Sequence, residues 1–220
     1  MDLSFHNLLS WILGGYFALL PMSNPFSTVP LLVSLTKGQT PHFQRAQGDR
    51  AVIFGAIIML GTLLLGSLIM KFFNISIPAL RIAGGFIICF YGFGMLTRNS
   101  AMQNANNFDS ADDYALVPLA MPSLVGPGTI SIIITFSTQI NEQTSVLGLV
   151  IGYGVVITAI VATAMTSFFV LRSSRFIMKL LGTKGIDVMT RFMGLILVCV
   201  GVQFFADGLE GFIIRLQTHF

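Results

Sequence analysis

The amino-acid sequence predicts an all-α membrane protein with six transmembrane helices in two inverted three-helix repeats, the first and fourth helices being discontinuous. Three observations lead to this fold class. Hydrophobic residues make up 54% of the 220-residue chain and charged residues only 10%, a balance that suits a lipid bilayer better than water. The apolar residues fall into six long stretches. Prolines are concentrated in two of those stretches.

The scarcity of charge excludes several classes of function. The formal net charge is only +3, so the isoelectric point of about 9.1 reflects few ionisable groups and predicts no nucleic-acid surface. Two cysteines and three scattered histidines predict neither a disulfide framework nor a metal site. The spans contain no histidine and no carboxylate near their middle, so we expect no enzyme and no cofactor.

The six apolar stretches cover residues 8–35, 51–70, 77–97, 115–139, 145–171 and 186–206. A spanning helix needs about 20 apolar residues, and each stretch meets that length. The stretches are continuous rather than alternating, which argues against transmembrane β-strands. A polar segment at 99–113 separates the first predicted repeat, residues 1–98, from the second, residues 114–220.

Basic residues are unevenly divided between the two sides of this topology. With the N-terminus outside, the cytoplasmic connections carry Lys37, Arg45, Arg50, Arg98, Arg172, Arg175, Lys179 and Lys184. The opposite side carries Lys71 and Arg215, and also Arg81 if that residue lies near the same face. Connections rich in lysine and arginine stay in the cytoplasm. The sequence therefore predicts that both termini lie outside.

Six of the eight prolines lie in two stretches: Pro21, Pro25 and Pro30 in the first, and Pro118, Pro122 and Pro127 in the fourth. Proline lacks a backbone donor and clashes with the preceding helical turn. Three prolines in one span predict a break rather than a kink. Unpaired backbone groups are costly in hydrocarbon, so each break must be buried in protein or line a cavity.

A short motif is shared by the two halves of the chain. Residues 81–89 and 191–199 both read Arg-x-x-Gly-x-x-x-x-Cys, and the broken stretches occupy corresponding places. Three spans in each repeat place the repeats in opposite orientations. That is the inverted-repeat architecture of many secondary transporters.

The two breaks carry small polar residues and glycines that predict a substrate site. A half-helix N-terminus attracts a carboxylate, and a half-helix C-terminus attracts an ammonium group or a cation. Without carboxylates, the breaks suit a small neutral solute better than a polycation. The candidate substrate-binding residues are Ser23, Asn24, Pro25, Ser27, Thr28, Pro122, Ser123, Gly126, Pro127, Gly128 and Thr129.

Two alternatives for these polar residues stay open at this point. Asn24 precedes Pro25 and favours an N-cap of the second half-helix, a role that is compatible with lining the site. The hydroxyl groups of Ser27, Thr28, Ser123 and Thr129 are equally suited to bonding backbone carbonyls freed by the breaks.

Over nearly its whole length the chain resembles the MarC family of bacterial inner-membrane proteins. The likeness is carried by Leu-Pro-Met-Ser-Asn-Pro at 20–25, Ile-Pro-Ala-Leu-Arg-Ile-Ala-Gly-Gly at 77–85, Val-Pro-Leu-Ala-Met-Pro-Ser at 117–123, Gly-Pro-Gly-Thr-Ile at 126–130 and Arg-Phe-Met-Gly at 191–194, leading into Val-Gly-Val-Gln-Phe at 200–204. The resemblance implies a multi-pass protein of the bacterial inner membrane with six helices, two of them broken around the site. Related small neutral amino acid transporters of the SnatA type carry glycine and alanine.

These observations predict a secondary transporter or exporter of a small neutral solute, with glycine or alanine as examples. Its expected partners are the lipid bilayer and that solute, and H⁺ or Na⁺ is the expected coupling ion. Transport would proceed by alternating access around a site near the bilayer midplane. A channel or a structural membrane protein is the alternative, although a channel usually needs a polar path through the whole bilayer.

Overall fold

The computed structural model describes residues 5–97, 113–143 and 145–217. All regular elements in these ranges are helical. They are α1 (Phe5–Ser23), α2 (Pro25–Leu35), α3 (Pro41–Phe72), α4 (Ile77–Thr97), the π-helical segment η2 (Ala115–Leu124), α5 (Pro127–Asn141), α6 (Val146–Arg172) and α7 (Ser174–Gln217). Residues 99–112 of the predicted polar segment lie outside the described residues.

The described chain contains the apolar helices that the sequence predicts. Five spans are long and apolar enough to cross a membrane, and a sixth is obtained if η2 and α5 form one span bent by 68°. The third and fifth predicted stretches agree with α4 and α6 to within one residue. The protein is therefore an all-helical integral membrane protein with five or six spans.

Two predicted stretches are shorter than the helices that contain them. Helix α3 begins at Pro41, ten residues before the predicted start at 51, because Thr40 caps its N-terminus and Pro41 occupies the first turn. Helix α7 covers 44 residues and includes the basic segment 174–185, which the sequence placed in a connection. Hydropathy marks the part of a helix that crosses the bilayer, and polar turns continue beyond it. A positive φ of 63° at Gly182 interrupts α7 within that segment.

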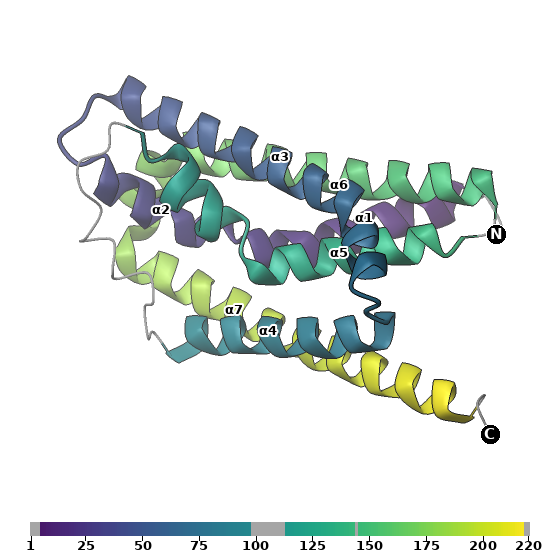
Figure 1. Ribbon diagram of the computed structural model, residues 1–220. Coiled ribbons are helices and arrows are strands. Elements are labelled where there is room, and N and C mark those ends of the chain that lie inside the picture. The colour runs from purple at the N-terminus through teal and green to yellow at the C-terminus, as the bar shows by residue number, and fades with distance from the viewer. Residues whose placement is uncertain (1–4, 98–112, 144, 218–220) are drawn as a thin grey trace.

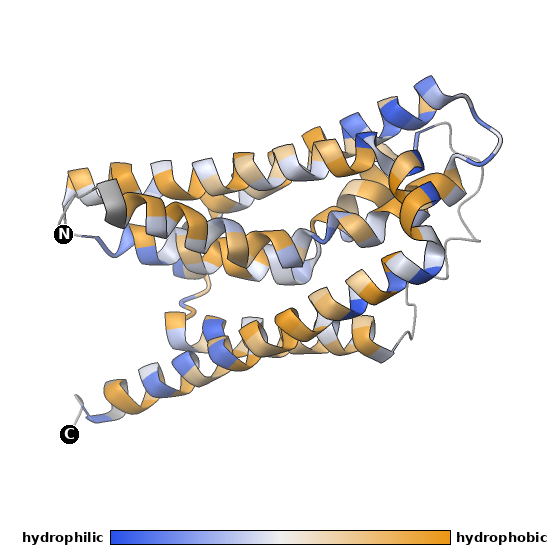
Figure 2. Ribbon diagram, turned by 180° about the vertical axis from the view of Figure 1, so that it is seen from behind, coloured by the Kyte–Doolittle hydropathy of each residue, from blue (hydrophilic) through white to orange (hydrophobic). Residues whose placement is uncertain are grey.

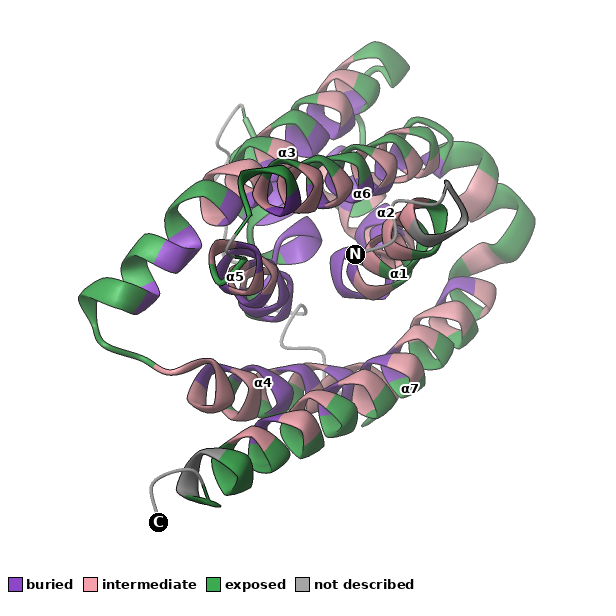
Figure 3. Cartoon of the chain, turned by 90° about the vertical axis from the view of Figure 1, so that its right-hand side faces the viewer, coloured by how far each residue is buried: buried purple, intermediate pink, exposed green. Residues whose placement is uncertain are grey.

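The helices form two layers, which Figure 1 shows one above the other. Helices α4 and α7 lie side by side in one layer, and the remaining helices form the other (Figure 3). Helices α5 and α2 connect the layers, since α4 packs on α5 and α7 packs on α2. The start of α1 and the end of α7 lie at the same end of the molecule. Which side of the membrane that end faces stays a prediction.

Glycines hold α4 and α7 in close contact. A Cβ atom added at Gly85 would lie 2.6 Å from the carbonyl oxygen of Gly201, and one at Gly92 would lie 2.8 Å from the carbonyl oxygen of Gly194. Real side chains do not approach backbone that closely, so only glycine fits. Small residues that let helix backbones approach are typical of helix pairs in membranes.

The outer surface is apolar along most of the bundle. Large side chains such as Phe72, Phe90 and Val146 are 83%, 74% and 81% exposed, as expected for contact with lipid rather than water. Figure 2 shows the hydrophilic residues of α3 gathered at its N-terminal end, away from this surface. The polar residues that are buried inside the bundle are therefore the ones that need a separate explanation.

Candidate functional site

The first break is a single residue, Asn24, between α1 and α2. Its φ of 25° and ψ of 68° end α1 and start a new helix at Pro25. Asn24 Oδ1 accepts a hydrogen bond from the backbone N–H of Ser27 at 3.4 Å, and Asn24 Nδ2 donates to Met95 Sδ at 3.5 Å. The side chain is only 1% exposed. The predicted break is confirmed, and Asn24 is the N-cap of α2.

The second break lies between η2 and α5 and is less regular. Val117 and Met121 have extended backbone angles inside η2, and each precedes a proline in a cis peptide bond. Gly126 is then the N-cap of α5, and Pro127 occupies its first turn. Glycine has no side chain, so this helix start has no side-chain cap. The two breaks thus differ: the N-terminus of α2 is capped and that of α5 is not.

Hydroxyl groups connect the two breaks. Thr28 on α2 and Ser123 on η2 are joined by a hydrogen bond of 2.7 Å between their Oγ atoms. These two residues are 0% and 4% exposed. They are 95 positions apart in the chain, so this bond directly joins the two interrupted spans.

Thr129, in the first turn of α5, has a buried hydroxyl without a partner. The residue is 1% exposed, and Oγ1 makes no hydrogen bond to any described residue. Threonine in a helix usually bonds the carbonyl four residues earlier, as Thr135 does to Ser131 O at 2.9 Å. For Thr129 that carbonyl belongs to Val125, before α5 begins. Burying an unpaired hydroxyl costs about 1–3 kcal/mol, so this group calls for a functional reason.

The start of α5 therefore presents several donors without internal acceptors. The N–H groups of Gly128 and Thr129 belong to its first turn, where no helical carbonyl precedes them. The aligned peptide dipoles make this end of the helix positive. Together with Thr129 Oγ1, these groups match the donors that bind a carboxylate or another small anion.

Helix α4 contributes residues to the site that the sequence analysis missed. The Tyr91 ring lies beside Gly126, where an added Cβ would be 3.6 Å from the phenolic oxygen, and Met95 contacts Asn24. Ile88 packs beside Gly128, together with Met22 from α1. Residues 84, 88, 91 and 95 share one helical face. That spacing was the available signal, although a largely apolar helix gives little reason to prefer one face.

Most of the other predicted site residues either bond the backbone of their own segment or lie at the protein surface. Ser23 Oγ donates to Leu20 O at 3.5 Å and Ser27 Oγ donates to Asn24 O at 3.0 Å, which is the backbone-bonding alternative. Pro25 is buried, whereas Pro122 and Pro127 are exposed. The structure thus joins Thr28 to Ser123 directly. It places Asn24 and Gly126 against the same helix, α4, through Met95 and Tyr91, and the two exposed prolines lie on the outer side of the second break.

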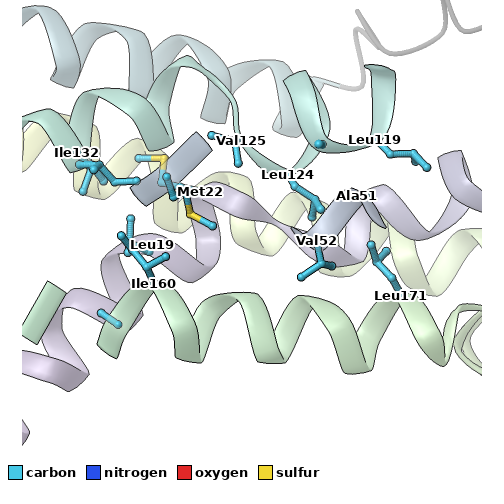
Figure 4. Packing of buried hydrophobic residues seen from close by; sticks show 14 of the residues in the cluster. Leu19, Met22, Ala51, Val52, Leu119, Leu124, Val125, Ile132, Ile160 and Leu171 are labelled. Carbon is cyan, nitrogen blue, oxygen red and sulfur yellow. The ribbon is translucent and has the colours of Figure 1, made fainter. Parts of the chain in front are cut away.

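Apolar side chains close the site toward both ends of the bundle. Figure 4 shows Leu19, Met22, Ile132 and Ile160 on one side of the breaks, and Leu119, Val52 and Leu171 on the other. Each of these residues is at most 7% exposed. The break region is therefore enclosed in this structure.

A cavity of about 460 Å³ approaches the site from the end where α1 begins. It lies between α1, α5 and α6 and is lined mainly by apolar residues, with Ser10, Gln139 and Gln143 as the polar ones. The last residue of α1 in its lining is Ala18, which directly precedes Leu19 and lies about one turn before Met22. That thin layer separates the cavity from the breaks.

Among the described residues, no group of three or more histidine, cysteine or acidic side chains is placed to hold a metal ion. The site is composed of hydroxyl groups, an amide, backbone N–H groups, a phenol and thioethers. These groups bind by hydrogen bonding and dipoles, without a formal charge.

Comparison with known proteins identifies the family. Residues 9–213 match the MarC family of integral membrane proteins. The chain is 38% identical to the UPF0056 inner membrane protein MarC of Salmonella typhimurium over 203 residues, which cover 88% of this chain and 91% of that protein. It is 36% identical over 211 residues to the protein of the same name from Escherichia coli, covering 89% and 92%. No solved structure matches the chain. The chain belongs to the MarC family of integral membrane proteins.

Proposed function

We propose that this protein is a secondary transporter of a small neutral solute, with small neutral amino acids such as glycine and alanine as the leading candidates. The solute binds where the two broken spans meet. Its carboxylate accepts hydrogen bonds from the first turn of α5 and from Thr129. A zwitterion needs an acceptor for its ammonium group as well, and the carbonyls at the end of α1 supply one.

The observation that carries the proposal is the buried hydroxyl of Thr129, which has no partner among the described residues, in the first turn after the second break. Interrupting two spans and burying an unpaired hydroxyl both cost free energy, and neither helps the bundle to fold. A solute that supplies acceptors at this place would satisfy the free donors. The size of the polar cluster, a few side chains and one helical turn, fits a molecule of a few heavy atoms.

An inverted repeat is part of the proposal, and the pairing of helices supports it. If α1–α2, α3 and α4 correspond to η2–α5, α6 and α7, the most extensive helix contacts have counterparts in the other half. Helix α1 packs on α6 as η2 packs on α3, and α5 packs on α3 as α2 packs on α6. The contacts of α4 with α5 and of α7 with α2 correspond in the same way.

Alternating access follows from this arrangement. The cavity of about 460 Å³ lies on the side of the breaks where α1 begins, so in this proposal the solute approaches the closed site from that side. In the opposite state, the corresponding helices of the other repeat would open a path to the other end. H⁺ or Na⁺ is the coupling ion that we propose.

The test is uptake of labelled glycine and alanine by the purified protein in liposomes, with imposed H⁺ or Na⁺ gradients. We expect saturable uptake that Asn24→Ala and Thr129→Val both reduce strongly. Thr158→Val is the matched control, because Thr158 is exposed on α6 and its hydroxyl bonds its own helix at Gly154 O. No saturable uptake of either amino acid, or equal uptake by wild type and both site variants, would refute the proposal.

A further inference from the structure

A second polar region lies far from the breaks, at the end of the bundle where α3 and α7 begin and α6 ends. Two adjoining cavities of about 440 and 280 Å³ share Pro41, Arg45 and Arg172 in their linings. The smaller one is also lined by Arg175, and its lining contains three arginines and no carboxylate. Like charges gathered in one small cavity repel one another, and an anion bound between them would remove that cost.

Buried or paired groups already hold two of these arginines in place. Arg175 Nε donates to Oε1 of Gln44, which is 3% exposed, and Gln44 Nε2 in turn donates to Ser174 Oγ at 3.3 Å. Arg172 Nη1 pairs with Asp49 Oδ2 at 3.2 Å, and its guanidinium lies 5.3 Å from the centre of the Phe168 ring. Both guanidinium groups keep further N–H donors.

Arg45 differs from the other two because it makes no ion pair or hydrogen bond to any described residue. It is exposed on α3 and lines both cavities. All five of its N–H donors are therefore available. Planar guanidinium groups with free donors suit the bidentate recognition of phosphate oxygens.

We propose that Arg45, Arg172 and Arg175 bind a phosphate ester, and specifically the headgroup of an anionic phospholipid. The surface beside the cavity supports a lipid as the source of the phosphate. Phe176 and Leu180 are 67% and 70% exposed on the first two turns of α7, next to the exposed Lys179. A short segment that exposes both apolar and basic side chains is typical of a helix lying at the membrane interface.

The acyl chains of such a lipid have a defined surface to follow. Phe169 on α6 is 60% exposed and lies one turn before Arg172, so the apolar belt begins directly beside the cavity. The phosphate would sit among the arginines, and the chains would lie against α6 and the start of α7. The bound lipid would thereby join α3, α6 and α7 at this end of the bundle.

The test is native mass spectrometry of the detergent-purified full chain, titrated with phosphatidylglycerol, phosphatidylcholine or soluble glycerol 3-phosphate. We expect phosphatidylglycerol to bind most tightly. Arg45→Gln should weaken it about tenfold, the effect of losing one charge-assisted hydrogen bond. Because Arg45 has no hydrogen-bond or ion-pair partner among the described residues, this substitution removes no such bond from the described fold.

Arg50→Gln is the matched control, since it changes the same charge on the same helix. Arg50 lies outside both linings and pairs with Asp113 at 3.4 Å, so its variant should bind phosphatidylglycerol within about twofold of wild type. Equal weakening by Arg45→Gln and Arg50→Gln would overturn the site. Phosphatidylcholine binding as tightly as phosphatidylglycerol would overturn the requirement for an anionic headgroup. Glycerol 3-phosphate binding equally tightly would overturn the proposal that the bound molecule is a lipid.

Discussion

The hydrogen bond between Thr28 and Ser123 gives a direct test of whether the two broken spans meet as described. Thr28→Val replaces the hydroxyl with a methyl group of similar size and leaves Ser123 Oγ buried without its partner. Leaving one such group unpaired costs about 1–3 kcal/mol. We expect a loss within that range, because Ser123 is only 4% exposed and its hydroxyl cannot turn to water.

The double variant Thr28→Val/Ser123→Ala separates the bond from the individual side chains. When both hydroxyl groups are absent, neither is left unpaired, so the second substitution costs less than it does alone. Hydrogen bonds between membrane helices show coupling energies that average about 0.6 kcal/mol and reach about 1.7 kcal/mol. We expect a value in the upper half of that range, because the 2.7 Å bond is fully buried.

The assay is a double-mutant cycle on the free energy of unfolding, measured by reversible denaturation in mixed micelles. Thr28→Val combined with Thr158→Val is the control cycle, because the hydroxyl of Thr158 bonds only Gly154 O on its own helix. That pair should be additive within about 0.3–0.5 kcal/mol. Coupling between Thr28 and Ser123 that is no larger than in the control would refute the contact between the breaks.

Three further predictions concern glycines and Thr129. Gly85→Ala places a Cβ 2.6 Å from a carbonyl oxygen of α7 and should lower the free energy of unfolding by about 1–3 kcal/mol. Gly94→Ala adds a Cβ that meets no atom within 4 Å and should change that free energy little. The same denaturation assay measures both variants, and equal effects would contradict the close packing of α4 on α7. A Cβ added at Gly14, in the lining of the cavity between α1, α5 and α6, meets no atom within 4 Å. Gly14→Leu should therefore slow solute uptake without unfolding the protein, while Gly154→Leu at an exposed position of α6 should not. Normal uptake by Gly14→Leu would exclude this cavity as the path. Thr129→Val removes a buried hydroxyl that has no partner among the described residues. It should stabilise the protein by about 1 kcal/mol while uptake is lost. A loss of stability instead would mean that Thr129 makes a structural hydrogen bond.

The breaks were predictable from sequence because proline acts locally. Pro25 and Pro127 are each the first residue of a new helix, directly after the N-cap residues Asn24 and Gly126. The missing backbone N–H of proline has the same effect in any surroundings. The capping role of Asn24 follows from equally local chemistry. By contrast, the lengths of α3 and α7 were underestimated. The run of apolar residues ends at the bilayer boundary, whereas the helical hydrogen bonding continues into the polar residues beyond it.

The composition of the site was harder to predict, because it depends on contacts between distant segments. Sequence alone did not distinguish Ser27, which bonds its own helix, from Thr28, which bonds Ser123 across the breaks. Tyr91 and Met95 were missed because they lie in an apolar run where no polar pattern marks the inward face. Tyr91 and Met95 face the site because of how α4 packs in the bundle, and local propensities carry no information about that packing.

Binding of a small amino acid at Thr129 is the central claim, and equilibrium binding of labelled glycine and alanine to the purified protein tests it most directly. We predict saturable binding to the wild type, retained binding in Thr129→Ser, which keeps the hydroxyl, and at least a tenfold loss in Thr129→Val, about the effect of one hydrogen bond to a charged carboxylate. Thr129→Val that binds as tightly as Thr129→Ser, or a wild type that binds neither amino acid, would contradict the account.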